Sequence, residues 1–478
     1  MVASSTSPMP LAAVPNEAER IFALQRAAVA EHGAPSHGER IAALDGLLAL
    51  IKKHRRLLVE TVSADFGNRA VAETELGELM PLIAGIKHVR RHLGRWMKPQ
   101  RRRVGLAFRP AAARVAYQPL GVVGVLAPWN YPLFLTLGPL VDALAAGNRV
   151  MLKPSELTPR TADLLKGLLG ELFDQDRVAV LTGGPEMAAR FSALGFDHLL
   201  FTGGAAIGRQ VMAAAAAHLT PVTLELGGKS PVVLCRDYPL KKAARTIAIG
   251  KFFNAGQTCV APDYALVPAD QVDAFAEAVI QAAAELYPTI AGNADYTSII
   301  ADRQYRRLTG MIEDARRGGA RVLQRTDDGA AAERKIVPTV LIGGREDAQA
   351  LREEIFGPIL PIVAYDDLDH AIRLINARPK PLALYCFSTD HAKIEGVLQR
   401  TSSGGATING TMLHVAQEDL PFGGVGESGM GAYHGREGFQ RLSHARAVLE
   451  LGRFNMSGRI AAPYGKLTRM VTRMLLGK

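Results

Sequence analysis

The stretch GVVGVL at residues 121–126 decides the fold class of this chain, because it is a continuous apolar run of strand length. A helical pattern follows at residues 132–146, and the next strand-like run is RVML at residues 149–152. The same cycle continues with strands at residues 178–181 and 198–201 and with helices at 161–173, from Glu186 and from Ile207. Apolar strands that alternate with helices indicate a parallel sheet covered on both faces. We therefore predict a doubly wound α/β sheet of the dinucleotide-binding type.

The segments on either side of this sheet predict an N-terminal helical region and a second α/β domain. Residues 16–97 follow a helical pattern, and a second alternating unit begins after residue 226. Its expected elements are helices at 240–253, 271–286 and 302–317 and strands at 359–364 and 382–387. The expected organisation is a flexible leader (1–15), a dinucleotide-binding domain (16–110 and 120–226), a second, catalytic α/β domain (227–428), a small β arm (111–119 and 429–455) and a tail (456–478).

Composition narrows the class of protein. A chain of 478 residues with 48% hydrophobic and 21% charged residues is typical of a soluble protein of two or more domains. Its net charge of +10 is densest at residues 87–103, but no nucleic-acid-binding motif accompanies that run, so we predict no nucleic-acid partner. Three cysteines without paired spacing fit a reducing compartment, and the lack of CxxC or HExxH patterns predicts no metal site. We find no secretory signal and no apolar stretch long enough to span a membrane.

Cys259 is the first candidate for chemistry. It follows NAG at residues 254–256, which ends the helix expected before it, and it precedes Pro262, so it lies on a turn. A thiol there is a candidate nucleophile, although taken alone it fits a small buried side chain equally well. Cys235 and Cys386 lie in apolar, strand-like runs and are expected to be inert.

Two polar residues on other turns complement this thiol. Glu225 stands inside an apolar run, where a carboxylate is either paired or has a pKa raised toward that of a general base. Asn130 follows the first core strand, and its amide either donates to a developing oxyanion or caps the next helix.

Two more turns fit a cofactor. The glycines of FTGGAAIG at residues 201–208 would let a pyrophosphate approach a helix N-terminus, or would simply make a tight turn. Lys153 and Glu156, in KPSE, follow the second core strand at the edge where such sheets bind cofactors, although a solvated loop is the alternative.

Taken together, these motifs resemble the aldehyde dehydrogenase superfamily. The matching segments, in family order, are PWN at 128–130, KPSE at 153–156, FTGG at 201–204 with Gly208, ELGGK at 225–229, GQTC at 256–259, EEIFGP at 353–358 and PFGG at 421–424. CVAPDY at 259–264 and GVGESGMGAYHG at 424–435 resemble the class 3-like branch. The helical N-terminal segment, at residues 90–97, is similar to that of bacterial coniferyl aldehyde dehydrogenases.

The resemblance implies a role for each matching residue. Cys259 would be the nucleophile and Glu225 the base that activates the deacylating water, while Asn130 and the Cys259 backbone N–H would form the oxyanion hole. The implied NAD or NADP contacts are Lys153 and Glu156 at the adenosine ribose, Gly203, Gly204 and Gly208 along the pyrophosphate, Glu354 and Phe356 at the nicotinamide ribose and ring, and Trp129 beside the cofactor. Gly204 and Ala205 stand where the family has a polar residue, so backbone N–H groups are left to bind the pyrophosphate.

The implied reaction is NAD(P)-dependent oxidation of an aldehyde to the acid through a cysteine thiohemiacetal and thioester. An aromatic, coniferyl-aldehyde-like substrate is favoured, with medium- or long-chain aliphatic aldehydes as the alternative. Rival chemistries are acyl transfer to coenzyme A, which would not need Glu225, a cofactor-free cysteine hydrolase using a distant His434, and a non-catalytic structural protein. Glu156 near the ribose would disfavour the 2′-phosphate of NADP.

The resemblance also implies a homodimer joined through the β arm. In the tail, apolar side chains recur at helical spacing opposite basic ones. The apolar set is Leu467, Met470, Val471, Met474 and Leu475, and the basic set is Lys466, Arg469 and Arg473. Such a segment lies on an anionic membrane, packs as a helix against a neighbouring subunit, or is a frayed chain end. We favour the subunit or the frayed end over the membrane, and expect a cytoplasmic enzyme.

Overall fold

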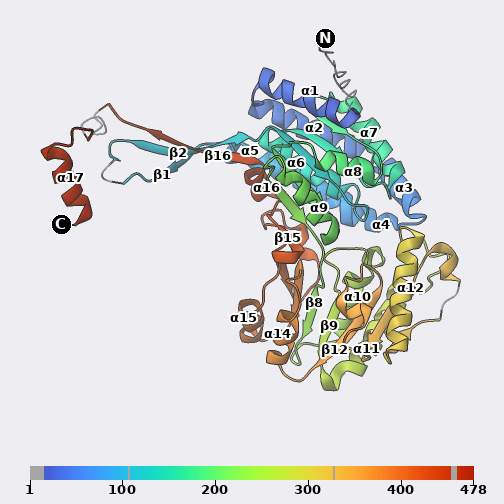
Figure 1. Ribbon diagram of the computed structural model, residues 1–478. Helices are drawn as coiled ribbons and strands as arrows, with labels where there is room; N and C mark the ends of the chain where they lie inside the picture. The colour runs from blue at the N-terminus through green and yellow to red at the C-terminus, as the bar shows by residue number, and fades with distance from the viewer. Residues whose placement is uncertain (1–15, 106–107, 327–328, 454–459, 478) are drawn as a thin grey trace, which may run out of the picture.

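The computed structural model describes residues 16–105, 108–326, 329–453 and 460–477. The predicted leader at residues 1–15 lies outside the described residues. Two α/β domains lie against each other, and a long β arm extends away from them to a separate C-terminal helix (Figure 1). The predicted α/β class is confirmed.

The N-terminal segment is helical, as expected. Its elements are α1 (Glu17–His32), α2 (His37–Lys53), α3 (Arg55–Phe66), α4 (Val71–Thr74), the π-helical turn η1 (Glu75–Leu79) and α5 (Met80–Trp96). Asn16 and Ser36 begin the first two helices with capping boxes, in which Glu19 and Glu39 bond back to the backbone of the capping residue.

The first domain is built on a six-stranded sheet in the order β15-β7-β6-β3-β4-β5. Its strands are β3 (Val122–Leu126), β4 (Arg149–Lys153), β5 (Val178–Val180), β6 (His198–Thr202), β7 (Val222–Glu225) and β15 (Gly429–Met430). Its helices are α6 (Phe134–Ala146), α7 (Pro159–Leu172), α8 (Pro185–Ser192), α9 (Ala205–Ala216) and α16 (Gly435–Arg441). The strands are parallel except β15, which runs antiparallel to β7.

Both faces of this sheet are covered, which explains the continuous apolar runs. Val123 and Val125 pack in one core cluster with residues of α2, α5, α6 and α7. Val122 and Leu199 pack in another with residues of α1, α8 and α9. Because successive strand residues point to opposite faces, a strand buried on both sides cannot show a polar alternation.

The second domain contains a seven-stranded sheet in the order β10-β11-β12-β9-β8-β13-β14, parallel except for the antiparallel edge strand β10. Its strands are β8 (Pro231–Leu234), β9 (Tyr264–Pro268), β10 (Arg321–Gln324), β11 (Thr339–Ile342), β12 (Ile359–Tyr365), β13 (Ala383–Phe387) and β14 (Gly405–Ile408). Its helices are α10 (Leu240–Phe252), α11 (Val272–Leu286), α12 (Asp302–Arg317), α13 (Gln349–Arg352), α14 (Leu368–Asn376) and α15 (His391–Arg400).

The bounds of the arm differ from the expected ones at both ends. Its antiparallel sheet consists of β1 (Gln100–Arg102), β2 (Ala112–Pro119) and β16 (Ser443–Glu450), so residues 100–102 belong to the arm. Residues 429–441 return instead to the first domain, where β15 joins the sheet and α16 packs on α5 and α6. Both segments are too short for the pattern of a single sequence to reveal their pairing partners.

The tail forms the helix α17 (Lys466–Leu476), which lies beyond the end of the arm (Figure 1). Met474 and Leu476 are exposed, at 78% and 75% of their full accessibility, whereas Leu467 and Val471 are half-buried. Within the described ranges, no helix combines the length and the apolar character needed to cross a membrane.

We predict that the tail does not attach the protein to lipid, because we expect its apolar face to pack against a neighbouring subunit. The full chain and a chain ending at Pro463 should sediment equally with anionic liposomes at physiological salt. Strong sedimentation of the full chain alone would show that the helix binds the membrane surface.

Candidate active site

Cys259 lies on an irregular loop between α10 and β9. The chain leaves the helix through η3 (Phe253–Gly256), where Asn254 and Ala255 both take left-handed backbone angles. Gly256 has a φ of +73°, and a Cβ at this position would come within 2.3 Å of the Gly357 carbonyl oxygen. Only glycine fits that close approach, so the loop is held in one shape. The thiol is half-buried and free.

Glu225 is the last residue of β7 and is almost fully buried, at 2% exposure. Neither of its carboxylate oxygens has a hydrogen-bond partner among the described residues. Burial raises the pKa of Glu225 well above its usual value, and the charge of Arg441 opposes that rise only in part. The structure thus resolves the two alternatives left by the sequence in favour of an unpaired carboxyl with a raised pKa.

The Cys259 thiol shares this dry environment with two carboxyl groups. Burial raises its pKa to about 12, and the negative charges of Glu354 and Glu225 raise it further. Burial likewise raises the pKa of Glu354 to about 8. Because the pKa values of Cys259 and Glu354 are about 12 and about 8, the protonated forms of these two groups are favoured at neutral pH.

Asn130 lies on the loop after β3 and reaches toward the cysteine loop. Its Nδ2 donates to the Gln257 carbonyl oxygen at 3.2 Å, two residues before Cys259. The helix-capping alternative is wrong, because Glu78 accepts from the first N–H groups of the following segment, those of Leu133 and Phe134. The amide of Asn130 therefore joins the loops of the two domains.

The expected adenosine-ribose contacts lie at the end of β4. Lys153 is buried, at 3% exposure, and its Nζ donates to Glu156 Oε2 at 3.2 Å. A buried ammonium group paired with a half-exposed carboxylate is not a solvated loop, so that alternative is wrong. This pair fits the two ribose hydroxyl groups of a dinucleotide, one as donor and one as acceptor.

The glycine turn after β6 leads into α9, at whose N-terminus no side chain of the described residues forms a cap. Gly204 is exposed, and no described atom lies within 4 Å of a Cβ built on it. The backbone N–H groups at the uncapped N-terminus of α9 fit a pyrophosphate. Gly208 is instead buried, and its Cβ position lies 2.8 Å from a Leu226 methyl carbon, so this glycine allows α9 to approach the sheet.

The expected nicotinamide contacts come from the second domain. Glu354 lies against Gly227, where a Cβ would meet the carboxylate at 2.0 Å. The Phe356 ring packs edge-on against Trp129 of the first domain, with 5.3 Å between the ring centres. A cavity of about 620 Å³ opens beside Gly227 and Glu354. Glu354 lines this cavity together with Ala205, the first residue of α9, so the cavity lies between the two domains.

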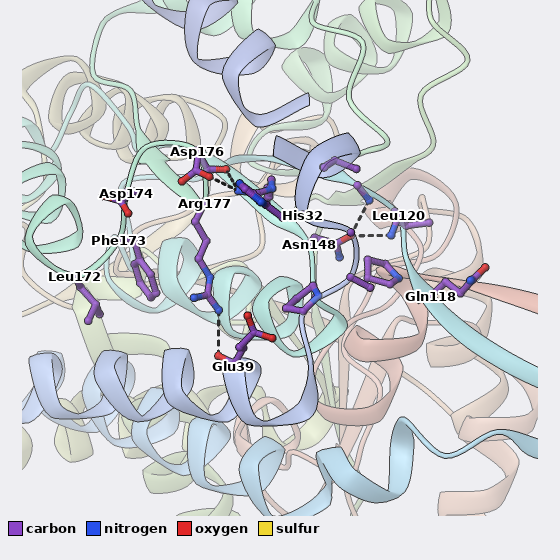
Figure 2. Close-up of a pocket in the computed structure, with 18 residues that line it drawn as sticks. His32, Glu39, Gln118, Leu120, Asn148, Leu172, Phe173, Asp174, Asp176 and Arg177 are labelled. Carbon is purple, nitrogen blue, oxygen red and sulfur yellow. Dashed lines mark hydrogen bonds and ion pairs between the residues drawn. The ribbon is translucent and has the colours of Figure 1, made fainter. Parts of the chain in front are cut away.

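A second cavity, of about 560 Å³, lies at the opposite edge of the first sheet (Figure 2). It is bordered by Gly121 and Arg177, which precede β3 and β5, and by Arg149, the first residue of β4. An ion pair of 2.8 Å joins Arg149 to Asp176. In open parallel sheets ligands bind at the carboxyl ends of the strands, so this cavity is at the wrong edge for the predicted site.

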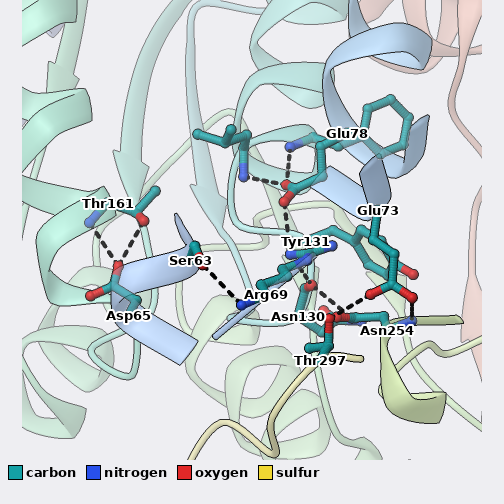
Figure 3. Close-up of polar contacts among 12 residues, drawn as sticks. Ser63, Asp65, Arg69, Glu73, Glu78, Asn130, Tyr131, Thr161, Asn254 and Thr297 are labelled. Carbon is teal, nitrogen blue, oxygen red and sulfur yellow. Dashed lines mark hydrogen bonds and ion pairs between the residues drawn. The ribbon is translucent and has the colours of Figure 1, made fainter. Parts of the chain in front are cut away.

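Sequence reasoning missed a polar cluster behind Asn130. Arg69, Glu73 and Glu78 precede or lie in the short helical turns before α5 and are buried around the Asn130 carbonyl (Figure 3). The two glutamates stand in a helical segment and belong to no motif. Their sequence does not show that they are buried, so only the structure identifies them as a cluster.

Comparisons with known proteins agree with this geometry. The chain matches the model of the aldehyde dehydrogenase family over residues 9–448 and belongs to that family. It oxidises aldehydes with NAD or NADP as the hydride acceptor.

Two curated relatives and one solved structure are especially similar. A Pseudomonas aeruginosa protein named "Probable coniferyl aldehyde dehydrogenase" is 50% identical, with 94% of each chain covered. The coniferyl aldehyde dehydrogenase of a Pseudomonas species is 45% identical, with 93% of each chain covered. The substrate-bound structure of AldH from Staphylococcus aureus superimposes with a TM-score of 0.91 at 37% identity, covering 96% of this chain and all of that one.

We predict that alkylation of Cys259 by iodoacetamide accelerates about tenfold for each pH unit between pH 7 and 10, because only the thiolate reacts and its pKa is raised to about 12. Mass spectrometry of the modified chain would separate this thiol from Cys235 and Cys386, which are buried. A rate that levels off below pH 9 would contradict the raised pKa.

Proposed function

We propose that this enzyme oxidises an aromatic, coniferyl-aldehyde-like aldehyde to the corresponding acid. The names of the two Pseudomonas relatives support the substrate class. Aromatic rings gathered beside the reacting thiol also support it. Phe422 and His434 are stacked with 5.2 Å between ring centres, and Phe134 packs edge-on against His434. Tyr433 belongs to the same group of rings, packing edge-on against His434 with 4.6 Å between ring centres.

Tyr433 places this aromatic cluster close to the reacting groups. Burial raises its pKa well above the usual value, and the charges of Glu225 and Cys259 contribute to that rise. A flat, conjugated aldehyde can pack against rings on several sides, whereas an aliphatic chain gains less from them. Medium- or long-chain aliphatic aldehydes are the alternative substrates.

In the proposed reaction, the Cys259 thiol first loses its proton to solvent, its sulfur then adds to the aldehyde carbon, and the carbonyl oxygen becomes an oxyanion. Asn130 Nδ2 carries a second hydrogen beyond the one given to Gln257, and it would donate this hydrogen to the oxyanion together with the Cys259 backbone N–H. NAD or NADP, when bound, supplies the acceptor of the hydride that leaves the same carbon. The carbon–sulfur bond is then a thioester.

Glu225 would complete the reaction by accepting a proton from the water that attacks the thioester. The acid leaves, and the cysteine recovers its proton. The observation that carries this proposal is the buried carboxyl of Glu225, which has no hydrogen-bond partner among the described residues. Its charge also raises the pKa of the Cys259 thiol. A structural glutamate would be paired, and transfer to coenzyme A would not require a base.

We propose that Lys153 and Glu156 hold the adenosine ribose, that the α9 N-terminus after Gly203 and Gly204 binds the pyrophosphate, and that Gly208 supports that turn. Glu354 and Phe356 would hold the nicotinamide ribose and ring, with Trp129 packed beside them. The carboxylate of Glu156 supports a preference for NAD, because it would repel a 2′-phosphate.

The assembly state and compartment are also proposals. Strand β2 and strand β16 project together from the two domains, and Leu449 and Leu451 are exposed at the end of that arm. Exposed apolar side chains on an extended sheet support a homodimer formed through the arm. Three free cysteines support a reducing, cytoplasmic location.

The variant Glu225→Gln should produce a burst of reduced cofactor and then turn over at least about 100-fold more slowly than the wild type, because the thioester forms but water is not activated. Stopped-flow absorbance would measure the burst. Cys259→Ala is the matched control and should bind cofactor without a burst. Normal steady turnover by Glu225→Gln would assign the base to another group.

A panel of aldehydes tests the substrate proposal. We expect coniferyl aldehyde and cinnamaldehyde to have the highest kcat/KM, and medium-chain aliphatic aldehydes to be about fivefold lower or more, because burial of an aromatic ring among rings contributes about 1 kcal/mol beyond its area. Each substrate is assayed with NAD and with NADP. A higher kcat/KM for hexanal or octanal would overturn the aromatic proposal.

A further inference from the structure

We infer that Arg69 and Glu78 act together as positioning residues that hold Asn130 in place for oxyanion binding. The inference rests on the proposed role of Asn130 and extends it to a buried ion pair in the N-terminal helical segment. Both side chains are fully inaccessible, and Arg69 Nη1 lies 2.8 Å from Glu78 Oε1. The two residues lie next to the loop that carries Asn130 (Figure 3).

Arg69 fixes the start of the loop that carries Asn130. Its Nη1 donates to the Asn130 carbonyl oxygen at 3.0 Å as well as to Glu78. The same carbonyl accepts a second hydrogen bond, at 3.2 Å, from Asn254 Nδ2 of the cysteine loop. With the carbonyl held from two sides, the peptide group next to the Asn130 Cα cannot rotate.

Glu78 fixes the end of the same loop. Its Oε2 accepts from the backbone N–H groups of Leu133 at 2.7 Å and Phe134 at 3.0 Å, where α6 begins. One ion pair therefore holds both sides of the turn, through a carbonyl at residue 130 and two N–H groups at 133 and 134. Only Tyr131 and Pro132 lie between these contacts.

The Arg69 guanidinium also links this turn to the reacting thiol. It lies over the Tyr131 ring, 4.8 Å from its centre, and the Phe66 ring is 5.1 Å away on another side. The Tyr131 hydroxyl is 2.6 Å from Thr258 Oγ1, and Thr258 immediately precedes Cys259. The cation therefore orients both the amide donor and the loop of the nucleophile.

A buried ion pair is weak evidence for a stabilising role, because the cost of removing two charges from water offsets their attraction. An apolar pair of similar volume would fill the same space. What it could not supply is the set of directional hydrogen bonds to the Asn130 carbonyl and the α6 N-terminus. This geometry fits a requirement for precise placement, since an error of about 1 Å in a catalytic group costs about 100-fold in rate.

The test is a double-mutant cycle between the ion pair and Asn130. The variant Arg69→Met with Glu78→Gln removes both charges together, so that no unpaired charge is left buried. We expect its kcat, and the rate of its first turnover, to fall by about 10- to 100-fold while KM changes less than about threefold. Thermal unfolding and cofactor binding show whether the variant is folded.

The two kinds of failure are distinguishable. Asn130→Ala alone should lower kcat by at least about 100-fold, and an unchanged kcat would overturn the proposed oxyanion role. If the ion pair acts through Asn130, adding its two substitutions to Asn130→Ala should lower kcat by less than about threefold further. A multiplicative loss, or a normal kcat in the folded ion-pair variant, would overturn the positioning role.

Asp65→Asn is the matched control. Asp65 is half-buried and lies in the neighbouring helix α3, where it accepts from the backbone N–H and the hydroxyl of Thr161 (Figure 3). It also accepts from the backbone N–H of Arg160. This variant should lower the unfolding temperature and leave the first-turnover rate within about twofold of the wild type. If it slows the first turnover as much as the ion-pair variant does, the effect is a general structural one and the inference is wrong.

Discussion

The hydrogen bond from the Asn130 side chain to the Gln257 carbonyl is the contact on which the site depends. It joins the loop after β3 in the first domain to the loop before β9 in the second. Asn254 strengthens the junction by donating to the carbonyls of both Asn130 and Gln257. Without this junction Asn130 and Cys259, the proposed oxyanion donor and nucleophile, would belong to two separately placed domains.

The burial of acidic groups is the second physical constraint. Burial raises the pKa values of Glu225, Glu354 and Cys259, and the charges of Glu354 and Glu225 raise the pKa of Cys259 further. A base with a raised pKa accepts protons more readily once it is ionised, and a protonated thiol resists oxidation. Burial therefore slows the reaction of Cys259 with other electrophiles. It also makes Glu225 a stronger base once that carboxyl is ionised.

Much of the architecture could be predicted because it depends on local patterns. The strands at residues 122–126, 149–153 and 198–202 are each buried on both faces, and such runs are visible as uninterrupted apolar sequence. The arm could not be bounded in this way, because β1 has only three residues and β15 only two. Segments of that length have no period, so their pairing depends entirely on which strand edges the rest of the fold leaves available.

The sequence by itself predicted the kind of chemistry. Cys259, Glu225 and Asn130 stand at the end of, or shortly after, elements with local patterns, and their side chains have few chemical uses. The sequence could not determine that Arg69 and Glu78 stand behind Asn130, because those residues are 61 and 55 positions away from their partners at 130 and 133 and carry no motif. Hydrogen bonds over such separations exist only after the helices and sheets have packed. Tertiary structure alone therefore decided how the reacting groups are held.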